Sequence, residues 1–580
     1  MKGKRSLVLL GSALLLAASA SGQTSSSREE LFSRALSVLS RDRVPPRLRV
    51  AERVAGSPGC ATFIVAQVRR DFHLFTAEQR RILRPLIVRP NLPENIVTGD
   101  GRFRVHFTRT GSDAVPATDS DGDGVPDFVE EVARAFERSW QVEIDSLGYL
   151  KPPDDAGVDG PEYDVYIQDL GERFYGFTQS ESDVPGTPQD DVRSYVVLDN
   201  DFNNNHFTTG VRGARVTAAH EFFHAIQFSY RNVKTAQEPF YYELCSIWME
   251  DVVYDAINDY YQYLPSFFRR RDEPFNKFVP SNFGEAVWDH FLVSKYGDID
   301  LVRTTWERMR GDLAPVPAID ATLRDVGSSF ASEFAEFGVW NYFTDGRADP
   351  AAYYEEGAAY PAVHLDGDFP LNADTTIAGS SLGLTHKSYR FTVQAAESYE
   401  LLGRVDKPDD WLFGVIVSQP DAQSSFRIVP ANIAAEIGFL PQSAQIVVIA
   451  VQTRVLRDSE LLSNASSERF EFDLRRSTEN RPESGITAVY PNPFVRSVHQ
   501  RLTVEFVLEQ AGEAELRIFT ADGRRVFEFD FNAADGAGSR AGLMKWDGRD
   551  QDGEPVASGL YLIQLRQNDF VDVQKVAVLR

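Results

Sequence analysis

Residues 217–230 read TAAHEFFHAIQFSY, and the middle of the chain is best interpreted from this stretch. Apolar residues recur there at intervals of three and four, which predicts an amphipathic helix. These apolar residues are Val216, Ala219, Phe223, Ile226 and Tyr230. On such a helix His220 and His224 lie one turn apart on the same face, with Glu221 beside them. Two imidazoles so placed can bind one Zn²⁺ ion, and the adjacent carboxylate can act as a general base.

A third ligand is needed, because a catalytic zinc ion usually has three protein ligands and one open position. Metzincins place a glycine and a third histidine after the second one, but Gln227 and Tyr230 stand at those positions. Glu243 follows His224 after 18 intervening residues, within FYYELCSIWMED, which reads as a helix. We therefore expect Glu243 to be the third zinc ligand. Glu250 and Asp251 are rivals for ligation but fit better as acceptors that orient the imidazoles.

These parts predict hydrolysis of peptide bonds. Zn²⁺ lowers the pKa of a bound water to about 7 and polarises the scissile carbonyl, while Glu221 moves the proton to the leaving amine. Such sites often add a tyrosine that donates to the oxyanion. The candidates are Tyr241, Tyr242, Tyr260 and Tyr261, and the sequence does not choose among them. The chain is thus expected to be a zinc-dependent endopeptidase.

A second metal-binding motif lies in residues 119–130, which read DSDGDGVPDFVE. Carboxylates fall at loop positions 1, 3, 5, 9 and 12 with glycine at position 6, the spacing of an EF-type Ca²⁺ loop. The predicted calcium ligands are Asp119, Asp121, Asp123, the carbonyl of Val125, Asp127 and Glu130. No helix is predicted before the loop, which therefore resembles the single loops of dockerin and thrombospondin type 3 modules. We expect a structural calcium ion.

The composition and the first residues restrict where the chain works. Its 580 residues include 60 Lys and Arg against 85 Asp and Glu, a net charge of −25, which argues against a nucleic-acid-binding protein. Basic residues, an apolar run over residues 7–18 and the small-residue site Ala18-Ser19-Ala20 predict a signal peptide, residues 1–22. The run is too short to span a membrane, and no later segment is long enough. We expect a secreted or cell-surface protein without a transmembrane segment.

Changes in composition along the chain predict a multidomain protein. Residues 23–100 are polar and rich in arginine, which favours a helical extension or pro-region. Residues 101–362 mix strand patterns with aromatic-rich helices, as expected for an α+β zincin-like catalytic domain that includes the calcium loop. Residues 363–480 and 485–580 hold short strand patterns between turn signals, which predict two all-β domains, a β-sandwich and an Ig-like domain.

The two cysteines leave three alternatives open. Cys60 and Cys245 could form a disulfide in an exported chain, or could remain two buried thiols. Because Cys60 falls in the predicted pro-region, its thiol could also cap a catalytic metal.

The predicted catalytic domain carries four motifs in the order GVPDFVEEVA, YDVYIQDL, VTAAHEFFHAIQFSY and WMED. In this order they resemble a family of exported bacterial metalloproteases, and the likeness covers residues 55–362. The resemblance implies a gluzincin-like peptidase with zinc at His220, His224 and Glu243 and the base at Glu221. Its partners would be protein or peptide substrates.

The C-terminal segment contains YPNPF, LRIFTADGRRVF and KWDGRDQDGEPVASGLYLIQL. These motifs resemble the Ig-like domain of flagellar hook-capping proteins and the related C-terminal sorting domains of type IX secretion. WDGRDQDG departs from the shorter sorting domains and favours the hook-cap-like version. The resemblance implies contact of residues 485–580 with secretion machinery or the cell surface.

Two other functions remain open from the sequence. The β domains could belong to a surface adhesion or matrix-binding protein whose zincin module is degenerate and inactive. An aminopeptidase would use the same zinc spacing, although the chain has no recognisable GxMxN motif to anchor a substrate amine.

Overall fold

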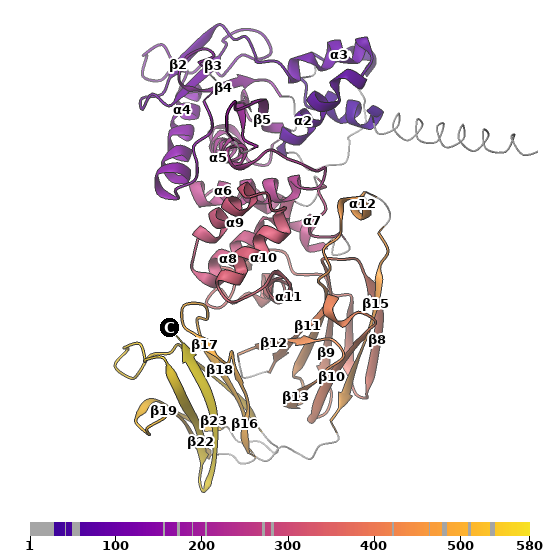
Figure 1. Cartoon of the computed structure of the whole chain (residues 1–580), viewed down its shortest axis with the longest axis vertical. Helices are drawn as coiled ribbons and strands as arrows, with labels where there is room; N and C mark the ends of the chain where they lie inside the picture. The colour runs from indigo at the N-terminus through magenta and orange to yellow at the C-terminus, as the bar shows by residue number, and fades with distance from the viewer. Residues whose placement is uncertain are drawn as a thin grey trace, which may run out of the picture. The chain divides into compact units, whose positions relative to one another are not determined.

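In the computed structural model the chain forms two compact units, called unit 1 and unit 2 (Figure 1). Unit 1 comprises Met1–Tyr263, Phe278–Ala286 and Trp306–Leu313, and unit 2 comprises Leu264–Lys277, Val287–Thr305 and Ala314–Arg580. The structure describes residues 28–40, 42–48, 59–154, 157–170, 174–187, 190–203, 206–269, 273–279, 283–419, 423–462, 465–477, 484–508, 512–533 and 540–579. The predicted signal peptide, residues 1–22, lies outside the described residues.

A mixed β-sheet forms the centre of unit 1, with its strands in the order β1-β5-β6-β4-β3-β2. The strands are β1 (Gly59–Cys60), β2 (Glu94–Val97), β3 (Phe103–Phe107), β4 (Tyr163–Gln168), β5 (Phe174–Asp183) and β6 (Val192–Asp199). Strands β3, β4 and β6 are parallel, whereas β5 runs antiparallel to β6. β1 pairs with the outer side of β5 in the parallel direction. Without the short strand β1, β5 would be the edge of this sheet.

Helices cover both faces of the sheet, because its strands place large apolar side chains on alternate sides. The helices of unit 1 are residues 28–36, α2 (Thr62–Asp71), α3 (Ala77–Leu83), α4 (Asp127–Trp140), α5 (Gly210–Tyr230) and α6 (Pro239–Tyr254). On one face Phe222 of α5 contacts Phe103 and Tyr163, and α4 and α6 pack against α5. On the other face residues 28–36, α2 and α3 share a core with Tyr195 and Val197.

The sheet takes strands from both sides of the boundary predicted at residue 101. β1 and β2 precede that residue, yet they pair with β5 and β3. Val65 and Val68 of α2 are fully buried in the same core as Tyr195. The predicted extension, residues 23–100, therefore supplies strands and core residues of unit 1 where it is described.

Helix α5 forms where a helix is predicted, but from Val216 onward it is buried on every side, so it does not expose a polar face to solvent as an amphipathic surface helix would. Every residue from Val216 to Tyr230 is buried. The apolar spacing accounts for one face of the helix; Phe222 and Phe228 extend the apolar surface beyond it, and the polar residues between them are buried too. The histidines of α5 are therefore enclosed in the protein interior.

Unit 2 begins with helices and continues into a β-sandwich. Its helices are α7 (Leu264–Arg269), α8 (Val287–Tyr296), α10 (Pro315–Asp325) and α11 (Phe330–Trp340), while α9 (Asp300–Arg310) starts in unit 2 and ends in unit 1. The sheets of the sandwich have the orders β13-β10-β15-β8 and β12-β11-β14-β9-β7. Trp411, Phe413, Phe470 and Phe472 lie in the core between them. The strands are β7 (Gly367–Leu371), β8 (Thr375–Ser381), β9 (Thr385–Val393), β10 (Glu397–Val405), β11 (Trp411–Ser418), β12 (Ser425–Pro430), β13 (Ala434–Leu440), β14 (Gln445–Gln452) and β15 (Glu468–Arg476).

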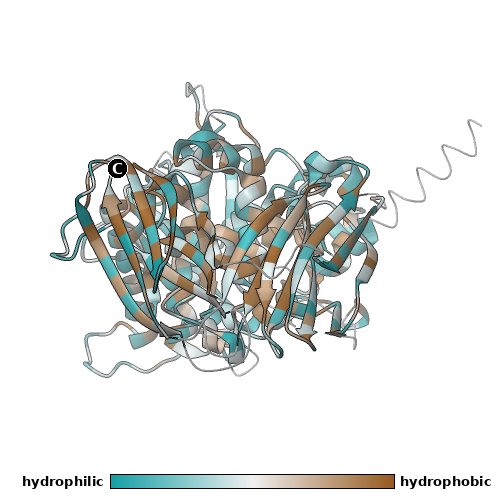
Figure 2. Ribbon diagram, turned by 90° about the horizontal axis from the view of Figure 1, so that it is seen from below, coloured by the Kyte–Doolittle hydropathy of each residue, from teal (hydrophilic) through white to brown (hydrophobic). Residues whose placement is uncertain are grey.

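A second sandwich ends the chain, with sheets in the orders β16-β18-β21 and β17-β23-β22-β19-β20 around Trp546 and Ile563. Its strands are β16 (Gly485–Tyr490), β17 (Phe494–Val495), β18 (Leu502–Leu508), β19 (Gly512–Thr520), β20 (Arg525–Ala533), β21 (Arg540–Trp546), β22 (Gly559–Gln567) and β23 (Phe570–Leu579). Hydrophobic and hydrophilic residues alternate along strands near the C-terminus (Figure 2), as expected for sheets with one buried face. The predicted multidomain architecture with an all-β C-terminal region is confirmed. None of the helices in the described part of the chain has both the length and the apolar character that a membrane span requires.

Candidate metal centre

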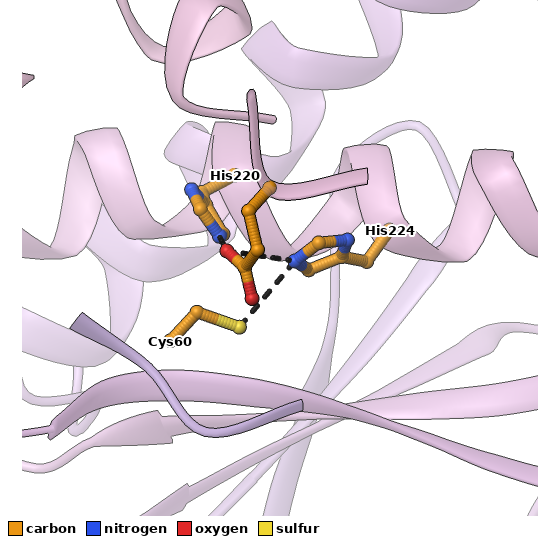
Figure 3. A group of neighbouring side chains, drawn as sticks. Cys60, His220 and His224 are labelled. Atoms are coloured by element: carbon orange, nitrogen blue, oxygen red, sulfur yellow. Dashed lines mark hydrogen bonds and ion pairs between the residues drawn. The ribbon is translucent and has the colours of Figure 1, made fainter. Parts of the chain in front are cut away.

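Four side chains from three separate segments meet beside α5 (Figure 3). His220 and His224 project from α5, Cys60 lies on β1 and Glu243 lies on α6. Nε2 of His220 lies 3.3 Å from Glu243 Oε2, and Nε2 of His224 lies 3.7 Å from the same oxygen. The Cys60 sulfur lies 3.3 Å from His224 Nε2. The four ligand atoms lie within 4.8 Å of one another, so this four-residue group could hold a metal ion.

The imidazole nitrogens that face away from the group are fixed by other side chains. His220 Nδ1 donates to Glu250 Oε1 at 2.7 Å, and His224 Nδ1 donates to Gln227 Oε1 at 2.7 Å. Gln227 is itself held by a bond from its Nε2 to the carbonyl of Tyr242, at 2.9 Å. Because each Nδ1 is engaged by an acceptor outside the group, each Nε2 faces the group, the orientation of a ligating imidazole.

Of the two carboxylates expected to orient the imidazoles, Glu250 contacts His220. Asp251 is the next residue on α6 and therefore points to another side of the helix. Gln227 supports the second histidine instead, and it was singled out in the sequence only for occupying a position where a metzincin has glycine.

Burial and charge act against each other on the ionisable groups here. Burial favours a higher pKa for Glu243, but contacts with His220 and His224 outweigh it and lower that pKa to about 2. Burial favours a lower pKa for His220, but Glu243 and Glu250 outweigh it and hold that pKa well above its usual value. Burial raises the pKa of Glu250 to about 8, against the opposing effect of His220. Without a metal ion, Glu243 is therefore ionised, and His220 and Glu250 share a proton.

Glu221 is buried at the contact between α5 and β5. Its Oε2 accepts hydrogen bonds from the hydroxyls of Thr62 at 3.1 Å and Thr178 at 2.8 Å. Its Oε1 is also buried but has no hydrogen-bond partner among the described residues. β5 comes this close because residue 176 is glycine, where a Cβ would lie 2.9 Å from Glu221 Cγ. One carboxylate oxygen is thus held in place, and the other is buried without a hydrogen bond among the described residues.

A small cavity adjoins His220 and Glu221, and Tyr263 is one of the residues that line it. Tyr263 was not among the tyrosines considered from the sequence. Of those, Tyr241 stacks on a tryptophan ring and Tyr242 donates its hydroxyl to a backbone carbonyl. No local pattern marks Tyr263, which is brought to this cavity by the fold.

The predicted calcium loop is exposed and gathers three of its carboxylates. Oxygens of Asp119, Asp121 and Asp123 lie within 4.8 Å of one another. Backbone N–H groups of the loop orient them: Gly122 donates to Asp119 Oδ1 at 2.8 Å and Val125 donates to Asp123 Oδ1 at 2.7 Å. The arrangement is therefore made almost entirely by the loop itself.

The last two predicted calcium ligands lie in the first turn of α4. Asp127 accepts hydrogen bonds from the N–H and the hydroxyl of Ser120, at 2.8 and 2.6 Å, and these bonds lower its pKa. Burial raises the pKa of Glu130; Arg134 opposes this, and Asp121 adds to the rise. Glu130 is thus close enough to the loop for the negative charge of Asp121 to raise its pKa.

Both cysteines are free thiols, so the disulfide alternative is wrong. Cys245 is fully buried on α6, whereas Cys60 belongs to the four-residue group.

No protein-family model and no curated protein matches the chain. Among solved structures it is similar to PorZ, a bacterial surface component of the type IX secretion system of Porphyromonas gingivalis, with 22% identity and a TM-score of 0.13. That match covers 23% of this chain and 14% of PorZ. Latent PorU of the same organism is 12% identical over 38% of this chain and 19% of PorU, with a TM-score of 0.15. The pre-peptidase C-terminal domain of Bacillus anthracis collagenase is 12% identical over 20% of this chain and 100% of that domain, with a TM-score of 0.13. Likenesses this weak carry no argument about the function of the chain.

Proposed function

We propose that the chain is a secreted zinc-dependent endopeptidase, in which His220, His224 and Glu243 bind the zinc ion and Glu221 is the general base. The single observation that carries this proposal is the convergence of three buried ligand atoms beside a buried carboxylate. Nε2 of His220 and Oε2 of Glu243 are buried 3.3 Å from each other, and no hydrogen bond to another described residue satisfies either atom. Burying polar atoms that are incompletely satisfied is costly, so a cation that accepts lone pairs from both would offset that cost.

The donor set fits zinc. Two imidazoles and one glutamate are a ligand set of catalytic zinc ions. Nitrogen and oxygen ligands about 2.0–2.2 Å from a tetrahedral zinc ion lie about 3.3–3.6 Å from one another. The distances from Glu243 Oε2 to the two Nε2 atoms, 3.3 and 3.7 Å, lie at the lower end of this range and just above its upper end.

The chain's own residues would then carry out proton transfer. A bound zinc ion supplies a polarised substrate carbonyl and a water molecule whose pKa is lowered to about 7. Oε1 of Glu221 would act as the proton acceptor and would return the proton to the leaving amine, while Thr178 holds Oε2. The hydroxyl of Tyr263, which lines the adjoining cavity, donates to the carbonyl oxygen as negative charge develops there.

The zincin-like assignment of unit 1 is part of the proposal. Three features support it. Helix α5, which carries the two histidines, packs against the mixed sheet, and the antiparallel strand β5 lies beside this helix. Glu243 lies on α6, the helix that follows α5. Export through residues 1–22 and contact of residues 485–580 with secretion machinery or the cell surface rest on the sequence motifs alone.

We also propose a structural Ca²⁺ ion in the loop of residues 119–130. The convergence of Asp119, Asp121 and Asp123 supports it, as does the proximity of Glu130 to their charge. Oxygen-only ligands in a flexible loop suit Ca²⁺ better than zinc.

The test compares two full-length variants, Cys60→Ala and Cys60→Ala with Glu221→Gln, so that the thiol beside the metal group is absent from both. We expect about one zinc per chain in each, measured by mass spectrometry of the metal. Only the first should hydrolyse an unstructured peptide library, and a chelator should abolish that hydrolysis. Cleavage of N-terminally blocked peptides separates an endopeptidase from an aminopeptidase. Equal hydrolysis by the two variants would overturn the proposed mechanism.

A further inference from the structure

The segment around Cys60 is added to unit 1 as a strand. Gly59 pairs with Phe174 and Cys60 with Gly176, both on the outer side of β5. The N–H of Ala61 donates to the carbonyl of Gly176 at 2.9 Å. The N–H of Thr178 donates to the hydroxyl of Thr62 at 2.8 Å. Residues 59–62 therefore use main-chain groups of β5 that an extended peptide would otherwise find free.

The same segment reaches both proposed catalytic groups. The Cys60 sulfur lies 3.3 Å from Nε2 of His224 and within 4.8 Å of the other two ligand atoms (Figure 3). The hydroxyl of Thr62 donates to Oε2 of Glu221 at 3.1 Å. One short segment therefore occupies the side of the metal group that three protein ligands leave open, and also bonds to the base.

The fit around this segment is tight. A Cβ at Gly59 would lie 3.0 Å from a ring carbon of Phe283 and 3.0 Å from the hydroxyl of Tyr263, so only glycine passes there without displacing a neighbour. Directly after Thr62, the ring of Phe63 meets the imidazole of His224 edge-on, with 5.4 Å between centroids. The segment and the first turn of α2 therefore cover the proposed active site.

Two independent observations agree on what the sulfur does there. The strand pairing brings Cys60 to the metal group, and the buried Nε2 of His220 and Oε2 of Glu243 face that group without hydrogen bonds among the described residues. A metal ion at their meeting point would have His220, His224, Glu243 and Cys60 around it, the number of ligands that closes a tetrahedral zinc site. A closed site has no position for water or substrate.

We propose that Cys60 is the fourth metal ligand of a latent enzyme, and that residues 59–62 lie on β5 where an extended peptide substrate binds by strand addition. The inference rests on the proposed function and names both the regulation and the substrate class of that site. Activation exchanges the sulfur for a water oxygen at the metal, and the released thiolate takes up a proton from solvent. The substrate is an unstructured polypeptide, because only an extended main chain can pair with β5 as Gly59 and Cys60 do.

The test uses the full-length chain with cobalt in place of zinc, because a thiolate bound to Co²⁺ gives a near-ultraviolet charge-transfer band. We compare the wild-type chain, Cys60→Ala and the matched control Cys245→Ala, which removes a thiol that is fully buried outside the group. The band should be present in the wild-type chain and in Cys245→Ala, and absent from Cys60→Ala. All three should retain about one metal ion per chain, because His220, His224 and Glu243 remain.

Hydrolysis of an unstructured peptide gives the second measurement. Cys60→Ala should be at least about tenfold faster than the wild-type chain, since a latent chain exposes its site only in a minor population. Gly59→Val keeps the thiol but crowds the segment against Phe283 and Tyr263, so it should weaken the band. The band is the only readout for this variant, because Tyr263 is the proposed donor to the oxyanion. This second variant guards against a folding defect specific to Cys60→Ala.

The outcomes separate the two proposals. A band that survives in Cys60→Ala, or equal hydrolysis by that variant and the wild-type chain, overturns the latency inference and leaves the peptidase proposal standing. A band that depends on Cys60 with no hydrolysis by Cys60→Ala overturns the peptidase proposal and leaves Cys60 as a metal ligand.

Discussion

The two metal-binding motifs of this chain differ in how their ligands are brought together. The four-residue group of Cys60, His220, His224 and Glu243 draws on β1, α5 and α6, and three of its members are almost completely buried. The loop of residues 119–130 draws only on neighbouring residues and is largely exposed. Other side chains orient the imidazoles of the group, whereas the loop's own N–H groups orient most of its carboxylates.

This difference indicates what each site depends on. The group exists only when the sheet and helices of unit 1 are in place, so its metal affinity should respond to single buried side chains. The loop is formed locally, so the loss of its ion should mainly loosen the start of α4. The predictions below test that contrast.

Glu243→Gln should have the largest effect. The variant removes the negative charge that both Nε2 atoms face, so zinc affinity should fall by more than about 100-fold, beyond the cost of losing an outer partner. Competition with a chromophoric chelator measures the affinity. Asp255→Asn is the matched control, because Asp255 is an exposed carboxylate directly after the last residue of α6, and it should bind zinc normally. Normal zinc binding by Glu243→Gln would instead mean that the third ligand lies elsewhere.

Acidification should release zinc well before calcium. The raised pKa of His220 means that the zinc-free group holds a proton that zinc must displace. Zinc affinity is therefore greatest above that pKa and should fall by about tenfold per pH unit as the pH drops through it. In the loop, bonds from Ser120 lower the pKa of Asp127 while burial raises that of Glu130, but the ionisable ligands are all carboxylates, whose ordinary pKa lies below that of histidine, so calcium should persist to a lower pH. Zinc and calcium titrations at several pH values check both slopes, and a zinc affinity independent of pH would contradict the proton exchange.

Glu250→Gln should weaken zinc binding by about tenfold, because a neutral amide is a poorer acceptor for His220 Nδ1 than a carboxylate. Asp251→Asn, one residue along α6, should change the affinity little. The same chelator competition measures both variants. Equal losses in the two would show that the orienting role was assigned to the wrong carboxylate.

The sequence could predict the parts of the site that lie close together in the chain, but not those that the fold brings together from distant segments. His220, Glu221 and His224 need only one helix to come together, so fourteen residues of sequence were enough to propose them. Cys60 reaches His224 across 164 positions through the pairing of β1 with β5, and no local spacing reveals that pairing. The sequence could therefore offer a metal-capping thiol only as one of three alternatives.

The fold shows the same division between local and distant determinants. Short strand-like runs between turn signals were enough to predict the β domains after Gly367, because each strand and turn carries its own local pattern. The environment of α5 was misjudged because periodicity reveals one apolar face and not what packs against the others. Tyr263 and Thr178 reach the site from a turn and a strand whose sequences carry no such signal.

Removal of calcium should have the smallest effect. Binding at about 100 times the dissociation constant stabilises a protein by about 2.7 kcal/mol, which shifts the melting temperature of a domain this size by several degrees. We therefore expect a calcium-selective chelator to lower the melting temperature of unit 1 by several degrees while the zinc content is unchanged. Asp121→Asn removes one of the converging carboxylates and should reduce that shift. Asp100→Asn removes a carboxylate outside the loop, so the chelator should lower the melting temperature of this variant as much as that of the wild-type chain. If the chelator leaves the melting temperature of the wild-type chain unchanged, the loop is an acidic turn held by its own N–H groups, and the four-residue group is the one metal site that remains proposed.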